Sequence, residues 1–361
     1  SLSTNPGHAG IVTLMRRTFT FGEYESTVSV TSLDRLHDDL GPSVLYVADT
    51  NTARFLPPGS AQVVLPPGEG AKSWRELERI LNEMLAADLT RRSVLVGVGG
   101  GVVSDIAALA ANLYMRGCRL VIIPTSLLAM VDASVGGKTG INFGGYKNMV
   151  GTFYPAHEVR IATETLRSLP EREYLSGLAE VIKTAMLGDE HLLGVLESEQ
   201  ERILSRDPEL LARIVRACVE VKGRIVEADL RESGVRAHLN LGHTFAHALE
   251  SVQGLGSWSH GEAVAWGLAR AMELGVTASI TPPEYGRRVV QLLAEYGFRI
   301  HPLPEMADAV RDAMRRDKKR QGDSIRFVLQ SGPGETLVTA IDTPAVDAVL
   351  SGRTDALDAR S

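Results

Sequence analysis

Three histidines and one glutamate have the types and the spacing expected of a metal site. His243 and His247 lie four positions apart in HTFAH, which places both imidazoles on one face of a helix. His260 follows in SHGE, and Glu180 lies in the helical pattern LAEVIK. Thr244 stands where a zinc protease would carry its catalytic glutamate, which argues against that class. A zinc-like ion takes three N and O ligands and keeps positions open for substrate oxygens, so this set predicts such a site.

A glycine-rich turn predicts a nucleotide site. Residues 99–105 read GGGVVSD, follow an apolar strand pattern and open a helical pattern. Consecutive glycines let the backbone approach a pyrophosphate, and a helix N-terminus supplies N–H groups and a positive dipole. The turn lacks the usual G-x-G-x-x-G fingerprint, so a turn that binds nothing is the competing interpretation.

A second glycine-rich segment combines lysines with acidic and amide side chains. Residues 131–138 read VDASVGGK, and residues 146–148 read YKN. The segment follows a buried strand pattern that ends at Pro124, and open α/β sheets bind ligands at such ends. Lysines beside a closely approaching backbone suit a phosphorylated or carboxylated substrate. Lys222 and Arg236 carry no such signal by themselves, because charged helix residues normally face water.

The elements that must position these residues change character near residue 160. Strands separated by helices predict a parallel sheet with helices on both faces. Before residue 160, apolar strand patterns and one helical pattern alternate, the strands at residues 44–48, 61–65, 93–97 and 120–123 and the helix at residues 73–87.

Helical patterns dominate the rest of the chain. They cover residues 170–249, 260–278 and 284–297, and a β-like segment at residues 324–329 is expected to close the ordered part. We therefore predict two domains. They are an α/β nucleotide-binding domain with a parallel sheet over residues 1–160, and an all-α metal- and substrate-binding domain over residues 161–361.

The composition excludes several classes of protein. A net charge of -6 leaves no basic footprint for nucleic acid. No apolar run reaches the roughly 18–20 residues that a membrane span needs, and the first residues lack a secretory leader pattern. Two cysteines cannot build a disulfide framework or a cysteine-rich zinc site. We therefore expect a cytoplasmic protein with a small-molecule substrate.

Taken together, these motifs resemble the 3-dehydroquinate synthase family of sugar-phosphate cyclases. The likeness runs from about residue 49 to residue 329. Each motif is weak alone, but the ordered set is specific. The segments that carry it are PGEGAKS at 67–73, GGGVVSD at 99–105, YMRG at 114–117, PTS at 124–126, VDASVGGKT at 131–139, KN at 147–148, GLAEVIK at 177–183, LNLGHTFAH at 239–247, HGE at 260–262 and DKK at 317–319.

The resemblance implies a role for each matching residue. A divalent metal, Zn2+ or Co2+, would be held by Glu180, His243 and His260. NAD would be contacted by Asp49, Glu69, Lys72, Gly100, Gly101, Asp105, Thr125, Ser126 and Lys147. The catalytic and substrate-binding cage would consist of Asp132, Lys138, Asn148, Lys183, Lys222, Arg236, Asn240, His247 and Lys319. Arg116 resembles an arginine that reaches the phosphate bound by the neighbouring subunit of the family's homodimer.

The implied substrate is a small anionic sugar phosphate, 3-deoxy-D-arabino-heptulosonate 7-phosphate, and the implied product is 3-dehydroquinate. Transient oxidation of a hydroxyl group by NAD acidifies the adjacent C–H, so that phosphate can leave by β-elimination. Hydride then returns, and ring opening with an intramolecular aldol closure completes the reaction. Such an enzyme is a carbon–oxygen lyase of the shikimate pathway, which leads to the aromatic amino acids.

Departures from the common synthase pattern keep related activities open. Residues 139–147 are closer to the matching loop of 2-epi-5-epi-valiolone synthases, and Ser126 and Ala246 replace a usual Thr and Gly. A carboxylated substrate is instead favoured by Asn240, His247, Lys222 and Arg236. Valiolone-type cyclases generally lack the histidine at 247 and carry aspartate in place of Asn240. An amino-dehydroquinate synthase would keep nearly the same set. A metal-dependent NAD polyol dehydrogenase would release NADH and would need no cage for phosphate and carboxylate.

Overall fold

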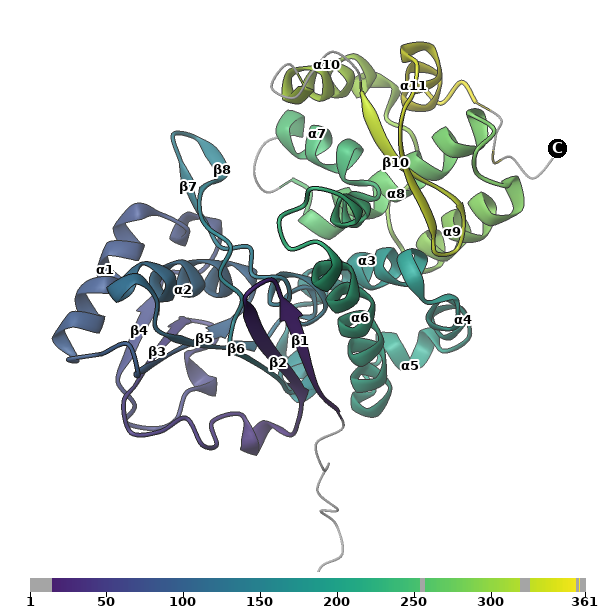
Figure 1. The fold of residues 1–361 in the computed structure, drawn as a ribbon. Coiled ribbons are helices and arrows are strands. Elements are labelled where there is room, and N and C mark those ends of the chain that lie inside the picture. The colour runs from purple at the N-terminus through teal and green to yellow at the C-terminus, as the bar shows by residue number, and fades with distance from the viewer. Residues whose placement is uncertain (1–14, 254–256, 319–324, 355–356, 358–361) are drawn as a thin grey trace, which may run out of the picture. The chain divides into compact units, whose positions relative to one another are not determined.

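The computed structural model describes residues 15–253, 257–318, 325–354 and 357, so Lys319 lies outside the described residues. The chain divides into two compact units (Figure 1). Unit 1 comprises Ser1–Leu169 and Pro208–Val219, and unit 2 comprises Pro170–Asp207 and Glu220–Ser361. Unit 1 is of the α/β type and unit 2 is mainly helical, which confirms the predicted fold class.

Unit 1 is built on a seven-stranded sheet in the order β1-β2-β9-β6-β5-β3-β4. β1 and β2 pair antiparallel, and the other neighbouring strands pair parallel. Parallel strands that are covered on both faces are continuous apolar runs, and β5 (VLVGVG) is buried along its whole length. The strands are β1 Met15–Phe21, β2 Tyr24–Val30, β3 Val44–Asp49, β4 Gln62–Leu65, β5 Val94–Gly99, β6 Arg119–Pro124 and β9 Glu158–Ile161.

Different parts of the chain cover the faces of this sheet. α2 (Gly101–Leu113) lies against β5 and β6, with α1 (Trp74–Ala86) beside it. Leu36 and Leu40, which both follow the short turn η1 (Leu33–Arg35), belong to an apolar cluster with alternate residues of β3, β5 and β6. The predicted strands that correspond to β3, β4, β5 and β6, and the predicted helix that corresponds to α1, are thereby confirmed.

Two hairpins of the structure were not predicted from the sequence. β1 and β2 show a partly alternating pattern of buried and exposed residues. β7 (Ile141–Phe143) and β8 (Tyr146–Val150) are joined by Gly144 and Gly145, with φ of +59° and +82°. Two adjacent residues at positive φ form the tight turn that matches the twist of a hairpin, and glycine adopts them without strain. The Gly-Gly pair was therefore the available signal for this hairpin.

α8 (His260–Thr277) is the central helix of unit 2 and is buried on nearly every side (Figure 1). It contacts α3, α7, α9, α11 and β10. A helix that is largely apolar around its circumference belongs in the interior of a domain. Within the described ranges, no helix combines the length and the apolar composition that a bilayer crossing requires. The other elements are α3 Glu171–Gly188, α4 Glu190–Ser198, α5 Gln200–Leu204, α6 Pro208–Ala228, α7 His243–Gln253, α9 Pro283–Glu295, α10 Ala307–Lys318, α11 Thr343–Leu350, β10 Arg326–Gly332 and β11 Glu335–Ala340.

The predicted helical regions are mainly helical in the structure. The prediction that residues 324–329 close the ordered part of the chain was wrong. The region 170–249 is divided into α3 to α7, with a 3-10 segment, η7 (Val235–Asn240), before α7. β10 is followed by β11 and α11. β11 pairs antiparallel with β10 through a tight turn in which Gly334 has φ of +76°. The segment ETLVTA (β11) forms a strand because it pairs with β10, and its sequence alone did not indicate a strand.

One buried glutamine ties the β10–β11 hairpin to the helices of unit 2. Gln330 is fully buried, and its Nε2 donates to the carbonyl of Met186 at 2.8 Å and to Oγ1 of Thr336 at 2.9 Å. Its Oε1 accepts a hydrogen bond from the hydroxyl of Tyr285 at 2.8 Å, and its carbonyl accepts one from Thr281 at 2.6 Å. Because Met186 lies in the last turn of α3, this network fixes the end of the helix that carries Glu180.

We predict that Gln330→Leu lowers the free energy of unfolding by about 2–4 kcal/mol, because the buried partners lose their hydrogen bonds. Urea denaturation followed by circular dichroism measures the change. Gln291→Leu is the matched control, since Gln291 is exposed on α9 and its replacement should cost no more than about 0.5 kcal/mol. An equal cost for the two variants would contradict the role given to Gln330.

Candidate active site

The three residues predicted as metal ligands come together in unit 2. Glu180, on α3, is fully buried, and its Oε1 lies 3.2 Å from Nε2 of His260 and 3.6 Å from Nε2 of His243. One ligand atom from each residue lies within 4.8 Å of those of the other two. His243 begins α7 and His260 begins α8, so three helices contribute one ligand each. Two imidazole nitrogens and one carboxylate oxygen form a donor set that suits Zn2+ or Co2+.

A hydrogen bond orients the ring of His243 for metal binding. Its Nδ1 lies 3.1 Å from the carbonyl of Leu241, so Nδ1–H donates and the lone pair of Nε2 faces Glu180. Burial, and then the charge of Lys183, lower the pKa of His243 to about 3. The imidazole is therefore neutral near pH 7, as a metal ligand must be.

Glu180 and His260 form a charged pair in the absence of an ion. Burial raises the pKa of Glu180, but Lys183, whose Nζ lies 2.6 Å from Oε2, and the two histidines hold it well below its usual range. Burial lowers the pKa of His260, but its contacts with Glu180 and Glu250 raise it to about 10. Glu250 Oε1 lies 3.7 Å from Nδ1 of His260. A cation that bound here would take the place of the proton on His260.

Two glycines of α8 allow the three helices to approach one another. A Cβ at Gly261 would lie 2.2 Å from the carbonyl oxygen of Ser176, on α3. A Cβ at Gly267 would lie 2.2 Å from the carbonyl oxygen of Gly242, just before α7. Neither overlap involves a flexible side chain, so any larger residue would push α8 away from the ligands on α3 and α7.

The start of α8 is fixed by a capping box. Ser259 Oγ accepts a hydrogen bond from the backbone N–H of Glu262 at 3.2 Å, and Glu262 Oε2 accepts one from the N–H of Ser259 at 2.6 Å. Arg172, on α3, also donates to Glu262 Oε2 at 2.8 Å. His260 follows Ser259 directly, so its backbone position is set by these bonds.

The other predicted residues of unit 2 are mostly buried cations. Lys183, Lys222 and Arg236 are 2%, 6% and 2% exposed, and such side chains are rarely buried unless they are paired, as Lys183 is with Glu180. His247 is exposed, and its ring centroid lies 5.3 Å from that of His243. His247 is not part of the ligand group, which leaves it available for proton transfer.

Two acidic residues that sequence reasoning missed hold Arg236 and Asn240. The Asp229 carboxylate accepts backbone N–H groups of Ser233 and Arg236 at 3.0 and 3.1 Å, and such bonds lower its pKa to about 2. Glu232, a non-glycine residue at φ of +59°, accepts a hydrogen bond from Asn240 Nδ2 at 2.6 Å. The only available signal was the charged, glycine-containing run DLRESG between two helices.

In unit 1, the glycine-rich turn lies at the carboxyl end of the sheet. β5 ends at Gly99, and α2 begins after Gly100, whose missing side chain leaves the helix without a side-chain cap. Thr125, after β6, donates its N–H to the carbonyl of Gly99 at 2.9 Å. Asp49 ends the neighbouring β3. Gly101, Thr125, Ser126 and Asp49 therefore share the edge at which open α/β sheets bind ligands.

A buried lysine connects three predicted contacts of unit 1. Lys72 is 4% exposed, and its Nζ lies 2.6 Å from Asp105 Oδ2 and donates to Asn148 Oδ1. Burial raises the pKa of Asp105, although the charge of Lys72 opposes that shift. Lys147, on the β7–β8 hairpin, is exposed. The structure thus brings Lys72, Asp105 and Asn148 into one contact network.

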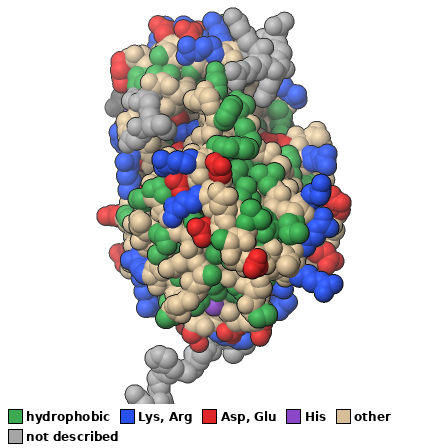
Figure 2. Space-filling model, turned by 90° about the vertical axis from the view of Figure 1, so that its left-hand side faces the viewer, with side chains coloured by type: hydrophobic (Ala, Val, Ile, Leu, Met, Phe, Trp, Pro, Cys, Tyr) green, Lys and Arg blue, Asp and Glu red, His purple; other side chains and the backbone are tan. Residues whose placement is uncertain are grey.

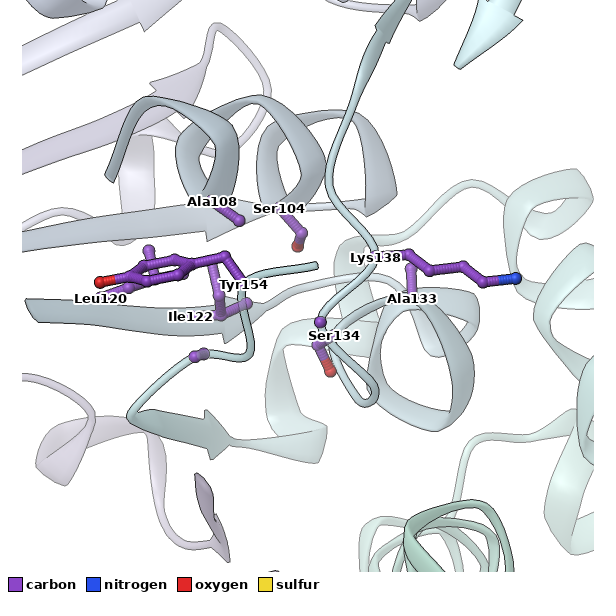
Figure 3. A pocket seen from close by; sticks show the side chains of 10 residues that line it. Ser104, Ala108, Leu120, Ile122, Ala133, Ser134, Lys138 and Tyr154 are labelled. Atoms are coloured by element: carbon purple, nitrogen blue, oxygen red, sulfur yellow. The ribbon is translucent and has the colours of Figure 1, made fainter. Parts of the chain in front are cut away.

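Asp132 and Lys138 lie on a turn beside a small cavity. Asp132 belongs to a π-helical turn, η5 (Ala129–Ala133). Lys138 lines the cavity with its backbone end, and its side chain points away from it (Figure 3). The hydroxyls of Ser104 and Ser134, which also line the cavity, have no hydrogen-bond partner. The cavity therefore lies behind Lys138 rather than at its charged end.

Arg116 is not brought together with the glycine-rich turn. It is exposed, has φ of +64°, and follows the C-terminal end of α2. A helix of 13 residues is about 20 Å long, which separates Arg116 from Gly101 by that distance.

Comparison with known proteins places the chain in a family. Two family models match: "3-dehydroquinate synthase N-terminal" over residues 62–176 and "3-dehydroquinate synthase C-terminal" over residues 177–320. The 3-dehydroquinate synthase of Acidithiobacillus ferrooxidans is 42% identical over 299 residues, which is 81% of each chain. The chain belongs to the 3-dehydroquinate synthase family. The region that matches the two 3-dehydroquinate synthase models contains every predicted site residue except Asp49.

Solved structures of sugar-phosphate cyclases share the fold. A 2-epi-5-epi-valiolone synthase from Streptomyces hygroscopicus, with NAD+ and Zn2+ bound, is 27% identical with a TM-score of 0.81, covering 92% of this chain and 97% of that chain. A 2-deoxy-scyllo-inosose synthase complexed with carbaglucose-6-phosphate, NAD+ and Co2+ is 22% identical with a TM-score of 0.82, covering 94% and 100%. The second likeness shows the fold alone.

We predict that Gly261→Ala lowers the free energy of unfolding by about 3 kcal/mol, because the methyl group overlaps the backbone of α3. Denaturation curves measure this effect. Gly194→Ala, on α4, is the matched control, because no atom lies within 4 Å of its added Cβ. It should stabilise the helix by about 0.5–1 kcal/mol. If Gly261→Ala is as stable as Gly194→Ala, the close approach of α8 to α3 is refuted.

Proposed function

We propose that the chain is a 3-dehydroquinate synthase, which converts 3-deoxy-D-arabino-heptulosonate 7-phosphate to 3-dehydroquinate and phosphate. The observation that carries this proposal is the convergence of Glu180, His243 and His260, with Lys183 in contact, in a member of this family. The enzyme would be a carbon–oxygen lyase that depends on NAD and on a divalent metal.

The residues present fit both cofactors. Glu180, His243 and His260 would hold Zn2+ or Co2+, because one oxygen and two nitrogens converge and the His243 ring is neutral. The uncapped start of α2 would receive the pyrophosphate of NAD, since its N–H groups have no side-chain acceptor. When bound, the metal would supply a Lewis acid for a substrate oxygen and NAD a reversible hydride acceptor.

The chain's own residues would bind and orient the anionic substrate. Arg236 is buried, its backbone N–H donates to Asp229, and its Nη1 donates to the carbonyl of Leu230. The guanidinium is therefore held in place and would bind a carboxylate of the substrate. Lys222, which is buried in unit 2, would neutralise phosphate oxygens. Asn240, held by Glu232, would orient a hydroxyl group. Such preorganised groups stabilise developing charge without reorganisation during the reaction.

His247 is proposed to move protons. Phosphate departure by β-elimination requires removal of a proton from the carbon next to a carbonyl group. The exposed imidazole of His247 lies beside His243 on the same face of α7 and outside the ligand group. It would accept that proton and pass it to the leaving phosphate.

We further propose that the enzyme acts as a homodimer in the cytoplasm, in the shikimate pathway. Arg116 is exposed, and the neighbouring Leu113 and Met115 are 45% and 50% exposed. Apolar side chains beside an exposed arginine suit a protein interface. Hydrophobic side chains also gather on the face drawn in Figure 2. In such a dimer, Arg116 would reach the phosphate bound by the neighbouring subunit.

We predict that His243→Ala lowers the affinity for Zn2+ by at least about a hundredfold, because loss of a ligand exceeds the 10–100-fold cost of losing a ligand's hydrogen-bond partner. Metal content after dialysis and chelator competition measure the affinity. His191→Ala, an exposed histidine on α4, is the control and should bind metal like the unmodified protein. Equal metal content in all three proteins would refute the ligand set.

The activity is tested by incubating the metal-loaded protein with NAD and 3-deoxy-D-arabino-heptulosonate 7-phosphate. We expect phosphate release and a carbocyclic product without net NADH. Net NADH without phosphate would instead indicate a polyol dehydrogenase. Turnover of only sedoheptulose 7-phosphate, or of only the amino analogue of the substrate, would assign the chain to a related cyclase.

A further inference from the structure

The β7–β8 hairpin carries predicted site residues but has little apolar contact to hold it in place. It extends from the body of unit 1 (Figure 1), and it contains Lys147 and Asn148. Phe143 and Tyr146, which flank its turn, are 57% and 52% exposed, and Met149 is 49% exposed. Ile141, the first residue of β7, is fully buried and anchors the base of the hairpin. The rest of a two-stranded hairpin with exposed apolar side chains is only marginally stable in water, so polar contacts must help to position it.

Asn142 supplies three of these contacts. Its backbone N–H donates to the carbonyl of Lys72 at 2.8 Å, and its Nδ2 donates to Oε1 of Glu69 at 2.9 Å. Its Oδ1 accepts the backbone N–H of Asn148 at 2.9 Å. One side chain thus joins both strands of the hairpin to the segment that precedes α1.

The two partners of the side chain require an asparagine. The Glu69 carboxylate needs a donor, and the N–H of Asn148 needs an acceptor, so the orientation of the amide is determined by its neighbours. An aspartate would place an oxygen against the Glu69 carboxylate, and an apolar residue would satisfy neither partner. Hairpin formation by itself does not require a side chain that has both a hydrogen-bond donor and an acceptor.

The contacts of Asn142 belong to a hydrogen-bond network that includes predicted cofactor- and substrate-binding residues. Lys72 Nζ donates to Asn148 Oδ1 and lies 2.6 Å from Asp105, on α2. Asn148 has φ of +53°, in the left-handed region that asparagine adopts more readily than most other non-glycine residues. The bond from its N–H to Asn142 holds it in this conformation.

We propose that Asn142, which is bonded to Glu69, is a positioning residue that fixes the hairpin so that Asn148 stays beside Lys72, with Lys147 next to it in the chain. This inference rests on the proposed function for the roles of those four residues. Asn142 lies at the base of the hairpin, so the exposed tip at residues 143–146 can vary without moving Asn148. The hairpin tip is part of the segment in which the sequence departs from the common synthase pattern.

The test compares Asn142→Asp, Glu69→Gln and the double variant Asn142→Asp/Glu69→Gln. Asn142→Asp opposes two carboxylates, while the double variant restores one donor and one acceptor with reversed polarity. Asn82→Asp, which adds the same charge at an exposed position of α1, is the control. The measurements are the dissociation constant of NAD by calorimetry, hydrogen exchange of the amides at residues 141–150, and KM and kcat for the substrate.

Asn142→Asp should weaken NAD binding and raise KM by about tenfold, and it should speed amide exchange in the hairpin, because a paired hydrogen bond is replaced by repulsion. The double variant should match Glu69→Gln alone within about twofold. Unchanged exchange in Asn142→Asp, or no recovery in the double variant, would overturn the proposal. Hydrogen exchange needs neither NAD nor turnover, so it decides the role of Asn142 even if the proposed activity fails.

Discussion

A carboxylate that is removed from water must be balanced by nearby positive charge, and Glu180 is such a carboxylate. An unpaired buried charge costs several kcal/mol, so its surroundings cannot be chosen freely. Lys183 lies 2.6 Å from one oxygen, and the two histidines approach the other. Lys183 lies on α3 itself, and the two histidines come from α7 and α8, which must stay close to α3. The need to balance the charge of Glu180 therefore restricts how α3, α7 and α8 pack against one another.

The rest of unit 2 meets that constraint with backbone contacts. Gly261 and Gly267 remove side chains where α8 meets α3 and the turn before α7. Gln330 holds the last turn of α3 from the other side, through the carbonyl of Met186. These features lie at different distances from the ligands, but all of them limit the movement of the same three helices. A donor set that is held in this way can bind an ion without first being ordered.

Sequence reasoning succeeded where a pattern is local and failed where a contact is distant. The strands β3 to β6 and the helices α8 and α9 follow from apolar runs and helical periodicity. Residue types predicted a metal site but left His247 open as a ligand, and the family resemblance selected Glu180, His243 and His260, which the structure brings together. By contrast, Asp229, Glu232 and Asn142 act through hydrogen bonds to backbone or amide groups that only the folded chain brings near. Their residue types are common in loops, so nothing in the sequence separated them from ordinary turn residues.

The fold by itself does not distinguish a cyclase from a dehydrogenase, since one fold supports several chemistries. Both enzymes need a hydride acceptor and a Lewis acid, and the glycine-rich turn and the ligand group serve either one. The distinction lies in the charged residues that only an anionic substrate requires. Lys222 and Arg236 are buried, and Arg236 Nη1 donates to the carbonyl of Leu230. A substrate with a carboxylate and a phosphate would use both positive charges, whereas a polyol has no anionic group for them to bind.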